Sequence, residues 1–327
     1  MPVASCRMAA EGRSSVSFET IATKWAALKP SARLVIITES ARLPLAEKIR
    51  LANASYVKEI GLINLTANEP YEEIMRNMTA QDVLLILLTM DGFMNEGYRD
   101  IFPPFDKPDG FAGKYVFIRL DIPEASLLAG LHTSLAKVEA IIRTCQTYKS
   151  GQQVRVTTEK GTDITMVVDY QELLPYDARL PGGHAFLPPA EISEELVVGS
   201  ANGVIVADIT VGELRFYADL IDLLGFVDED VKITVKDGLV TDITGGEIAR
   251  RLQAGLAKQP KALQTLVELG HGLSDLSPTG IIGVDESMNG TCHFGIGNRD
   301  PYHVDVVVAN PCISIVKENP HVSIYTV

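Results

Sequence analysis

The sequence has few cysteines and no long apolar run. Among its 327 residues are four cysteines, Cys6, Cys145, Cys292 and Cys312, and no two of them form a CxxC pair. A chain of this length can bury a sizeable core without disulfides, so we expect reduced thiols and a cytoplasmic protein. The densest apolar run, Val83 to Leu88, is too short to cross a bilayer. The first 15 residues also lack the apolar segment typical of a signal peptide.

Positive charge is also scarce. The chain has 29 Lys and Arg against 42 Asp and Glu, which gives a formal net charge of −13. Proteins that bind nucleic acid or anionic membranes need clustered basic residues, so we expect neither partner. The glycine-rich nucleotide fingerprints GxGxxG and GxxxxGK[ST] are absent from the first half. These absences favour a small-molecule substrate.

The first half alternates strand-like and helix-like patterns. Leu34–Thr38 and Val83–Leu88 are continuous apolar runs, as expected for strands buried on both faces. The amphipathic stretch Pro44–Tyr56 follows the first run, and Tyr115–Leu120 is a later strand. Apolar strands separated by helices predict a Rossmann-like parallel sheet in an α/β domain of residues 1–150.

The second half is rich in strands. Two hairpins are predicted, Gln153–Thr158 with Asp163–Val168 and Val231–Val235 with Leu239–Ile243, each around a glycine-containing turn. Further predicted elements are helices at Glu247–Lys258 and Pro260–Leu269 and strands at Thr291–Ile296, Val304–Val308, Ile313–Val316 and Val322–Tyr325. We therefore expect residues 151–327 to form a β-rich α+β domain.

The six histidines are concentrated in that second half. His303 and Asp305 lie at i and i+2 of a predicted strand, so their side chains share one face and can bind one divalent metal ion. A strand-edge histidine with no ligand is the alternative. His132 and His321 have no supporting context, and we assign them to structure.

Three other histidines have a setting that suits a site. His271 follows a helix-like segment and begins a loop rich in Gly, Ser and Pro, where binding residues concentrate, although it could simply end a helix. His293 has the small neighbours Thr291 and Gly295 on its own strand face. His184 lies in a proline- and glycine-rich loop, and an exposed loop histidine is an equal alternative.

The second half resembles the superfamily of aminopeptidase T, the M29 metallopeptidases and their relatives. The matching stretches are VRVTTEKGTDITMVV, LPGGHAFLPPAEISEELVVGSANGVIVAD, VKITVKDGLVTDITGGEIARRL, GIIGVDESMNGTCHFGIGN and HVDVVVANPCISI. They cover roughly residues 152–316 in the family's order. The resemblance makes this half the metal-binding catalytic domain, and it implies a homo-oligomer.

The aminopeptidase branch of the superfamily implies a site for two metal ions. His293, His303 and Asp305 fall on three of its ligand positions, whereas His184 and His271 stand at the positions of two glutamates. A neutral imidazole binds one metal through one nitrogen and cannot replace a bridging carboxylate. This difference favours the other branch.

That branch resembles 2,5-dihydroxypyridine 5,6-dioxygenase and implies one Fe(II) ion bound by two histidines and an aspartate. His271 with its loop, His303 and Asp305 match those three ligands. We therefore predict a mononuclear non-haem Fe(II) dioxygenase that uses O₂ to cleave a hydroxylated N-heteroaromatic ring such as a dihydroxypyridine. His184, His293 and Tyr302 are the candidates for moving protons.

Two alternatives stay open. The first is an aminopeptidase-like hydrolase using Zn, Mn or Co, in which His293 joins the metal site and Glu286 or Asp275 assists. The second is a non-catalytic binding protein that has kept the fold, because fold alone does not set function.

Overall fold

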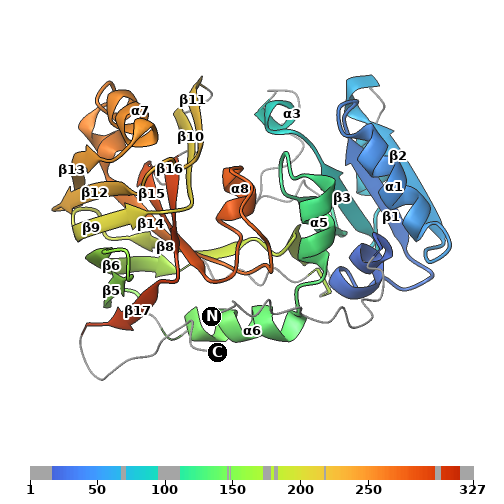
Figure 1. Ribbon diagram of the computed structural model, residues 1–327. Helices are drawn as coiled ribbons and strands as arrows, with labels where there is room; N and C mark the ends of the chain where they lie inside the picture. The colour runs from blue at the N-terminus through green and yellow to red at the C-terminus, as the bar shows by residue number, and fades with distance from the viewer. Residues whose placement is uncertain are drawn as a thin grey trace, which may run out of the picture.

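The fold is described from a computed structural model of the chain. It describes residues 17–67, 71–94, 111–145, 147, 149–171, 178–179, 183–216, 219–298 and 303–316. An α/β part and a strand-rich part lie side by side, and helices α5, α6 and α8 lie between or beneath them (Figure 1). The expected combination of an α/β domain with a β-rich domain is confirmed.

The α/β part is built on a five-stranded parallel sheet. Its order is β2-β1-β3-β4-β7. The strands are β1 (Arg33–Thr38), β2 (Glu59–Asn64), β3 (Val83–Leu87), β4 (Lys114–Ile118) and β7 (His184–Leu187). All five residues of β3 are buried, because helices and loops cover both faces of a parallel sheet. The predicted Rossmann-like layout is confirmed.

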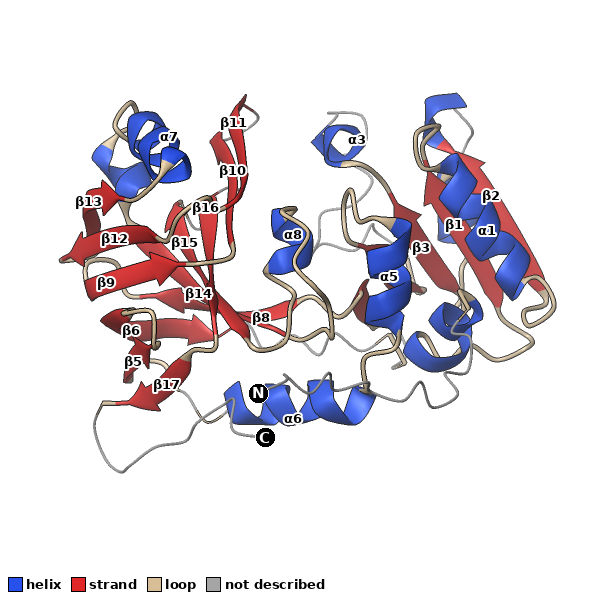
Figure 2. Cartoon of the chain, in the orientation of Figure 1, coloured by secondary structure: helices blue, strands red, loops and turns tan. Residues whose placement is uncertain are grey.

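The helices of this part are short. They are η1 (Ile21–Trp25), α1 (Leu43–Asn53), η2 (Leu65–Ala67), α2 (Glu72–Arg76), α3 (Met90–Met94), α5 (Glu124–Leu131) and α6 (Leu135–Cys145). Among the described residues, no single helix is long and apolar enough to cross a membrane. Within the same residues, α5 and α6 together have the length and composition of a membrane span, but the pair is bent by 82°. Helix α6 runs along the base of both parts (Figure 2).

The strand-rich part is an antiparallel sheet that curls strongly. Its main path is β11-β10-β16-β15-β14-β8-β6-β9-β12-β13, with β5 and β17 paired beside β6. The strands are β5 (Gln153–Thr157), β6 (Asp163–Gln171), β8 (Glu191–Leu196), β9 (Asn202–Ala207), β10 (Thr210–Phe216), β11 (Asp219–Phe226), β12 (Val231–Lys236), β13 (Leu239–Thr244), β14 (Leu266–Gly272), β15 (Thr291–Gly297), β16 (His303–Ala309) and β17 (Cys312–Ile315). The helices are α7 (Glu247–Leu256), η3 (Lys261–Gln264) and α8 (Ile282–Asp285). Both predicted hairpins form, as β5–β6 and β12–β13.

One predicted helix is wrong. Residues 260–269 form the short helix η3 and then enter strand β14. Strand β14 pairs with β15 along one edge and with β8 along the other, so its backbone groups are satisfied from both sides. Tertiary pairing therefore overrides the helix-like spacing of the sequence. The change matters because it alters which side chains of residues 266–272 share a face.

The two parts are interleaved in sequence. Strand β7, which comes after the expected boundary near residue 150, adds to the parallel sheet beside β4. Ile192 and Leu273 of the strand-rich part belong to the core cluster of the α/β part. The domain boundary at residue 150 stays a prediction, and β7 lies on the other side of it from the rest of its sheet.

Candidate metal centre

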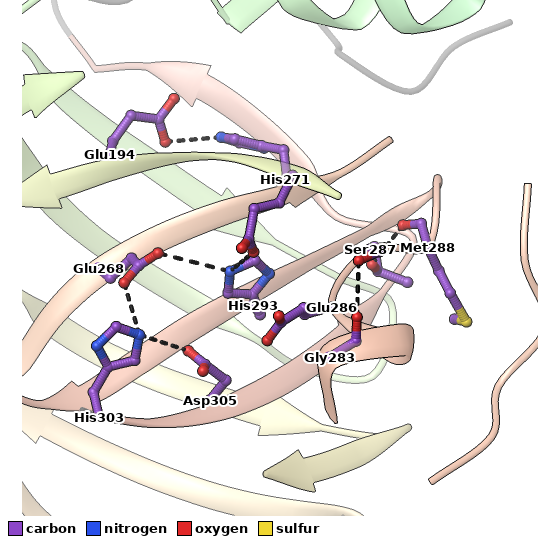
Figure 3. Close-up of polar contacts among 12 residues, drawn as sticks. Glu194, Glu268, His271, Gly283, Glu286, Ser287, Met288, His293, His303 and Asp305 are labelled. Atoms are coloured by element: carbon purple, nitrogen blue, oxygen red, sulfur yellow. Dashed lines mark hydrogen bonds and ion pairs between the residues drawn. The ribbon is translucent and has the colours of Figure 1, made fainter. Parts of the chain in front are cut away.

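Five acidic and histidine side chains converge on one face of the antiparallel sheet. Within the registers of β8, β14, β15 and β16, Glu191 lies opposite Gly272, Gly270 opposite His293, and Gly295 opposite Asp305. Alternation along the strands then places five side chains on the same face. These are Glu191, Glu268, His293, His303 and Asp305, and Figure 3 shows the last four converging.

Glu268 joins the cluster into one unit. Its Oε2 lies 2.8 Å from His303 Nε2, and its Oε1 lies 3.9 Å from His293 Nε2. His293 Nε2 is also 2.8 Å from Glu191 Oε2, and His303 Nε2 is 3.3 Å from Asp305 Oδ1. Two overlapping groups result, one of Glu191, Glu268 and His293 and the other of Glu268, His303 and Asp305. Each carboxylate oxygen of Glu268 faces a different group.

Two glycines make room for the imidazoles. A Cβ at Gly270 would collide with the His293 ring, and one at Gly295 would lie 2.7 Å from the His303 ring and 2.9 Å from Glu268 Cβ. Any larger residue would push the rings away from the carboxylates. Gly270 and Gly295 thus leave the space that the two imidazoles occupy.

The charges of the cluster support one another. Burial alone would raise the pKa of Glu268, but the adjacent His303 and His293 outweigh it and hold this pKa well below its usual range. Burial would lower the pKa of His293, but Glu191 and Glu268 raise it to about 10. Asp305 and Glu268 likewise raise the pKa of His303 well above its ordinary value. Without a metal ion, the three carboxylates therefore keep both imidazoles protonated.

The same five residues fit divalent cations. Two ligand atoms that each lie about 2.1 Å from one ion are roughly 3.0–3.4 Å apart. Most of the separations between imidazole nitrogens and carboxylate oxygens in the cluster are close to this range. Glu191 Oε2 and Asp305 Oδ1 are buried and accept no directed hydrogen bond, although each lies beside an imidazole. Four of the side chains are 14–21% exposed, so solvent reaches the cluster. Oxygen and imidazole donors suit Zn, Mn, Co and Fe(II).

The α/β part contributes one cation to this centre. Arg119 follows β4, and its side chain contacts Glu286 just after α8, while its Nη1 lies 3.7 Å from Glu191 Oε1. Its Nε donates a hydrogen bond of 2.7 Å to the carbonyl of Gly283 in α8. Asp285 anchors the same helix by accepting hydrogen bonds from Thr279 and Gly280. Arg119 therefore positions both Glu191 and α8.

The structure brings together only some of the residues expected from the sequence. His303 and Asp305 are adjacent, and His293 is beside them through Glu268. His271 points to the opposite face of β14 and lies 2.8 Å from Glu194. The His271, His303 and Asp305 ligand set stays a prediction, but the described geometry places His271 in a separate group.

Most of the remaining expected residues lie away from the cluster or outside the described residues. His184 begins β7 in the parallel sheet, opposite Tyr115. Asp275 forms an ion pair with Lys137 at the surface, whereas Glu286 lies beside the cluster (Figure 3). Tyr302 and His321 are outside the described residues.

Sequence reasoning missed Glu191 and Glu268. Glu268 was hidden because its segment was expected to be helical, whereas in a strand it alternates with Leu269 and shares a face with Gly270. Glu191 starts a strand that was not predicted. The sequence signal for Glu268 is its place two positions before Gly270. In a strand the two residues share a face, opposite strand β15, which also carries small residues.

Fold and site together define a two-part α/β and β-rich protein with a carboxylate–histidine centre. Residues 114–276, just under half of the chain, match the sequence model of the family described as 2,5-dihydroxypyridine 5,6-dioxygenase. No curated protein sequence matches the chain.

Two solved structures share the fold. The 2,5-dihydroxypyridine dioxygenase of Pseudomonas putida KT2440 superposes with a TM-score of 0.62 at 14% identity, covering 91% of this chain and 92% of that one. AmpT of Thermus thermophilus superposes with a TM-score of 0.54 at 13% identity, covering 91% and 94%. The chain shares the fold of both proteins, and its residues 114–276 match the family model, in agreement with the resemblance seen in the sequence.

Proposed function

We propose that the chain is a metal-dependent hydrolase that cleaves an amide bond, such as the first peptide bond of a short peptide, with two divalent cations. The observation that carries this proposal is the position of Glu268, whose two carboxylate oxygens face two different groups of ligands. A bridging carboxylate is what a two-metal site requires. Glu191 and Glu268 would supply the two glutamates that this chain lacks at the motif positions of the aminopeptidase branch.

The residues divide the work between two positions. Glu191 and His293 would hold one cation, His303 and Asp305 the other, and Glu268 both. Bound cations would polarise the scissile carbonyl and lower the pKa of a water molecule. Glu286 is our candidate for accepting the proton of that water, because it lies beside the cluster and Arg119 fixes its position. His293, and after it Arg119, hold the pKa of Glu191 below its ordinary value in spite of burial, and Arg119 also orients the Glu191 carboxylate.

Reconstitution tests this proposal. Protein stripped with a chelator would be loaded with Zn²⁺, Mn²⁺ or Co²⁺ and assayed against a panel of aminoacyl anilides and dipeptides. We expect hydrolysis that requires metal and grows until two ions per chain are bound. An Asp242→Asn variant, altered on exposed strand β13, is the matched control and should behave as wild type. Failure of every metal-loaded sample to hydrolyse any panel member would contradict the proposal.

A second candidate is the Fe(II) dioxygenase. It is supported by the match of residues 114–276 to the dioxygenase family and by the adjacent pair His303 and Asp305. In this case one Fe(II) ion would be bound, and a hydroxylated N-heteroaromatic substrate and O₂ would take the remaining positions. Protein loaded anaerobically with Fe(II) would then consume O₂ in the presence of 2,5-dihydroxypyridine. O₂ uptake with one iron per chain would favour this candidate over the hydrolase.

A further inference from the structure

A second group of metal-binding side chains lies on the opposite face of the sheet. Cys145, Glu194 and His271 are each fully buried, and one ligand atom from each lies within 4.8 Å of the other two. His271 Nε2 is 2.8 Å from Glu194 Oε2 (Figure 3). None of these residues takes part in the proposed hydrolysis.

The strand registers explain why this group forms. His271 lies opposite Ile192 of β8, and Glu194 lies opposite Leu269 of β14. Their side chains therefore project from the face that does not carry Glu268. Cys145 is the last residue of α6 and belongs to the core cluster of the α/β part. The group thus joins a helix of one part to two strands of the other.

We propose that Cys145, Glu194 and His271 bind one divalent metal ion such as Zn²⁺, which holds α6 against β8 and β14. Thiolate and imidazole donors select ions such as Zn²⁺ over Mg²⁺ and Ca²⁺. One thiolate, one carboxylate and one neutral imidazole balance the charge of a divalent ion, so the loaded site is neutral, as full burial requires.

One further feature favours a cation here. Cys145 lies at the C-terminal end of α6, where the helix dipole favours positive charge. Burial, together with the charge of Glu194, raises the pKa of the Cys145 thiol well above its ordinary value. An ion would therefore release a proton from this thiol on binding.

Cobalt substitution tests the site without relying on activity. The full chain would be refolded with one to three equivalents of Co²⁺, and its absorption spectrum compared with that of a Cys145→Ser variant. We expect a thiolate-to-cobalt charge-transfer band in the wild type and a large loss of it in the variant. Cys312→Ser, altered at an exposed cysteine, should keep the full band.

Zinc content gives a second, independent result. After dialysis against a chelator, we expect the wild type to retain one zinc ion per chain because the site is fully buried, and His271→Gln to retain none. Glu268→Gln should still retain that ion, which separates this site from the proposed catalytic centre. Absence of a thiolate–cobalt band in refolded wild type, or equal zinc retention in wild type and His271→Gln, would overturn the proposal and leave a metal-free hydrogen-bonded group.

Discussion

The two faces of strands β8, β14 and β15 carry two different clusters of polar residues. One face has three carboxylates and two histidines, four of them 14–21% exposed. The other face carries a carboxylate and a histidine, and the thiol of Cys145 from α6 lies against them; all three are fully buried. An oxygen-rich cluster that solvent can reach suits exchangeable ions and a substrate, whereas a sulfur-containing cluster in the core suits a permanent structural ion. Exposure and donor type therefore separate the proposed catalytic centre from the proposed structural one.

Removing the bridge should produce the largest effect. In Glu268→Gln the side chain keeps its size but loses its charge, so neither cation is shared. We expect kcat/KM for metal-dependent hydrolysis to fall about 10³-fold, as for loss of a principal electrostatic group. Steady-state kinetics at saturating Zn²⁺ or Mn²⁺ would measure it. A decrease of less than tenfold would mean that Glu268 does not bridge.

Changing the buried cluster should instead affect stability. His271→Ala removes the imidazole that lies 2.8 Å from the buried Glu194 carboxylate, and we expect the free energy of unfolding to fall by about 3–5 kcal/mol. Chemical denaturation would measure the loss, with Glu194→Gln/His271→Ala as the control that also removes the Glu194 carboxylate. An equal loss of stability in His303→Ala, at the partly exposed cluster, would remove the proposed distinction between the faces.

Arg119 links the exposed cluster to the α/β part. Arg119→Met keeps the length of the side chain but leaves Glu191 and Glu286 without a cation. We expect metal affinity and kcat/KM to fall about 10- to 100-fold, as for residues that orient metal ligands. Arg119→Lys should restore part of the loss. Wild-type metal affinity in Arg119→Met, measured by calorimetry, would show that Glu191 needs no positioning.

The pH dependence of metal-free stability should be a smaller effect. Glu268 has a folded pKa below its ordinary value of 4.5, so its contribution is present above pH 4.5 and lost as the pH falls through the folded value. His293 has a folded pKa raised from 6.5 to about 10, so its contribution is present below pH 6.5 and lost as the pH rises through about 10. Metal-free protein should therefore gain most from this cluster between about pH 4.5 and 6.5.

Thermal unfolding with chelator or with Zn²⁺ would check this window. Added Zn²⁺ should restore stability above pH 6.5, because the ion replaces the imidazole protons. His293→Gln should flatten the alkaline side of the metal-free profile. If wild type and His293→Gln lose the same stability at alkaline pH, that loss comes from another group.

The sequence predicted the sheets better than the site. Continuous apolar runs such as Leu34–Thr38 revealed the parallel strands, and glycine-containing turns revealed the hairpins, because both signals are local. The shared face of His303 and Asp305 follows from a local signal of the same kind. The faces of Glu268 and His271 could not be predicted, because they depend on β14 being a central strand, which β8 and β15 impose from distant parts of the chain. Cys145 could not be linked to Glu194 and His271 without the packing of α6.

Anomalous scattering from crystals grown with Mn²⁺ or Co²⁺ would test the central claim most directly. The account predicts two peaks on the exposed face, one beside Glu191 and His293 and the other beside His303 and Asp305, with the Glu268 carboxylate between them. A single peak bound by His303 and Asp305, with no second ion beside Glu191 and His293, would contradict it and would favour a mononuclear site.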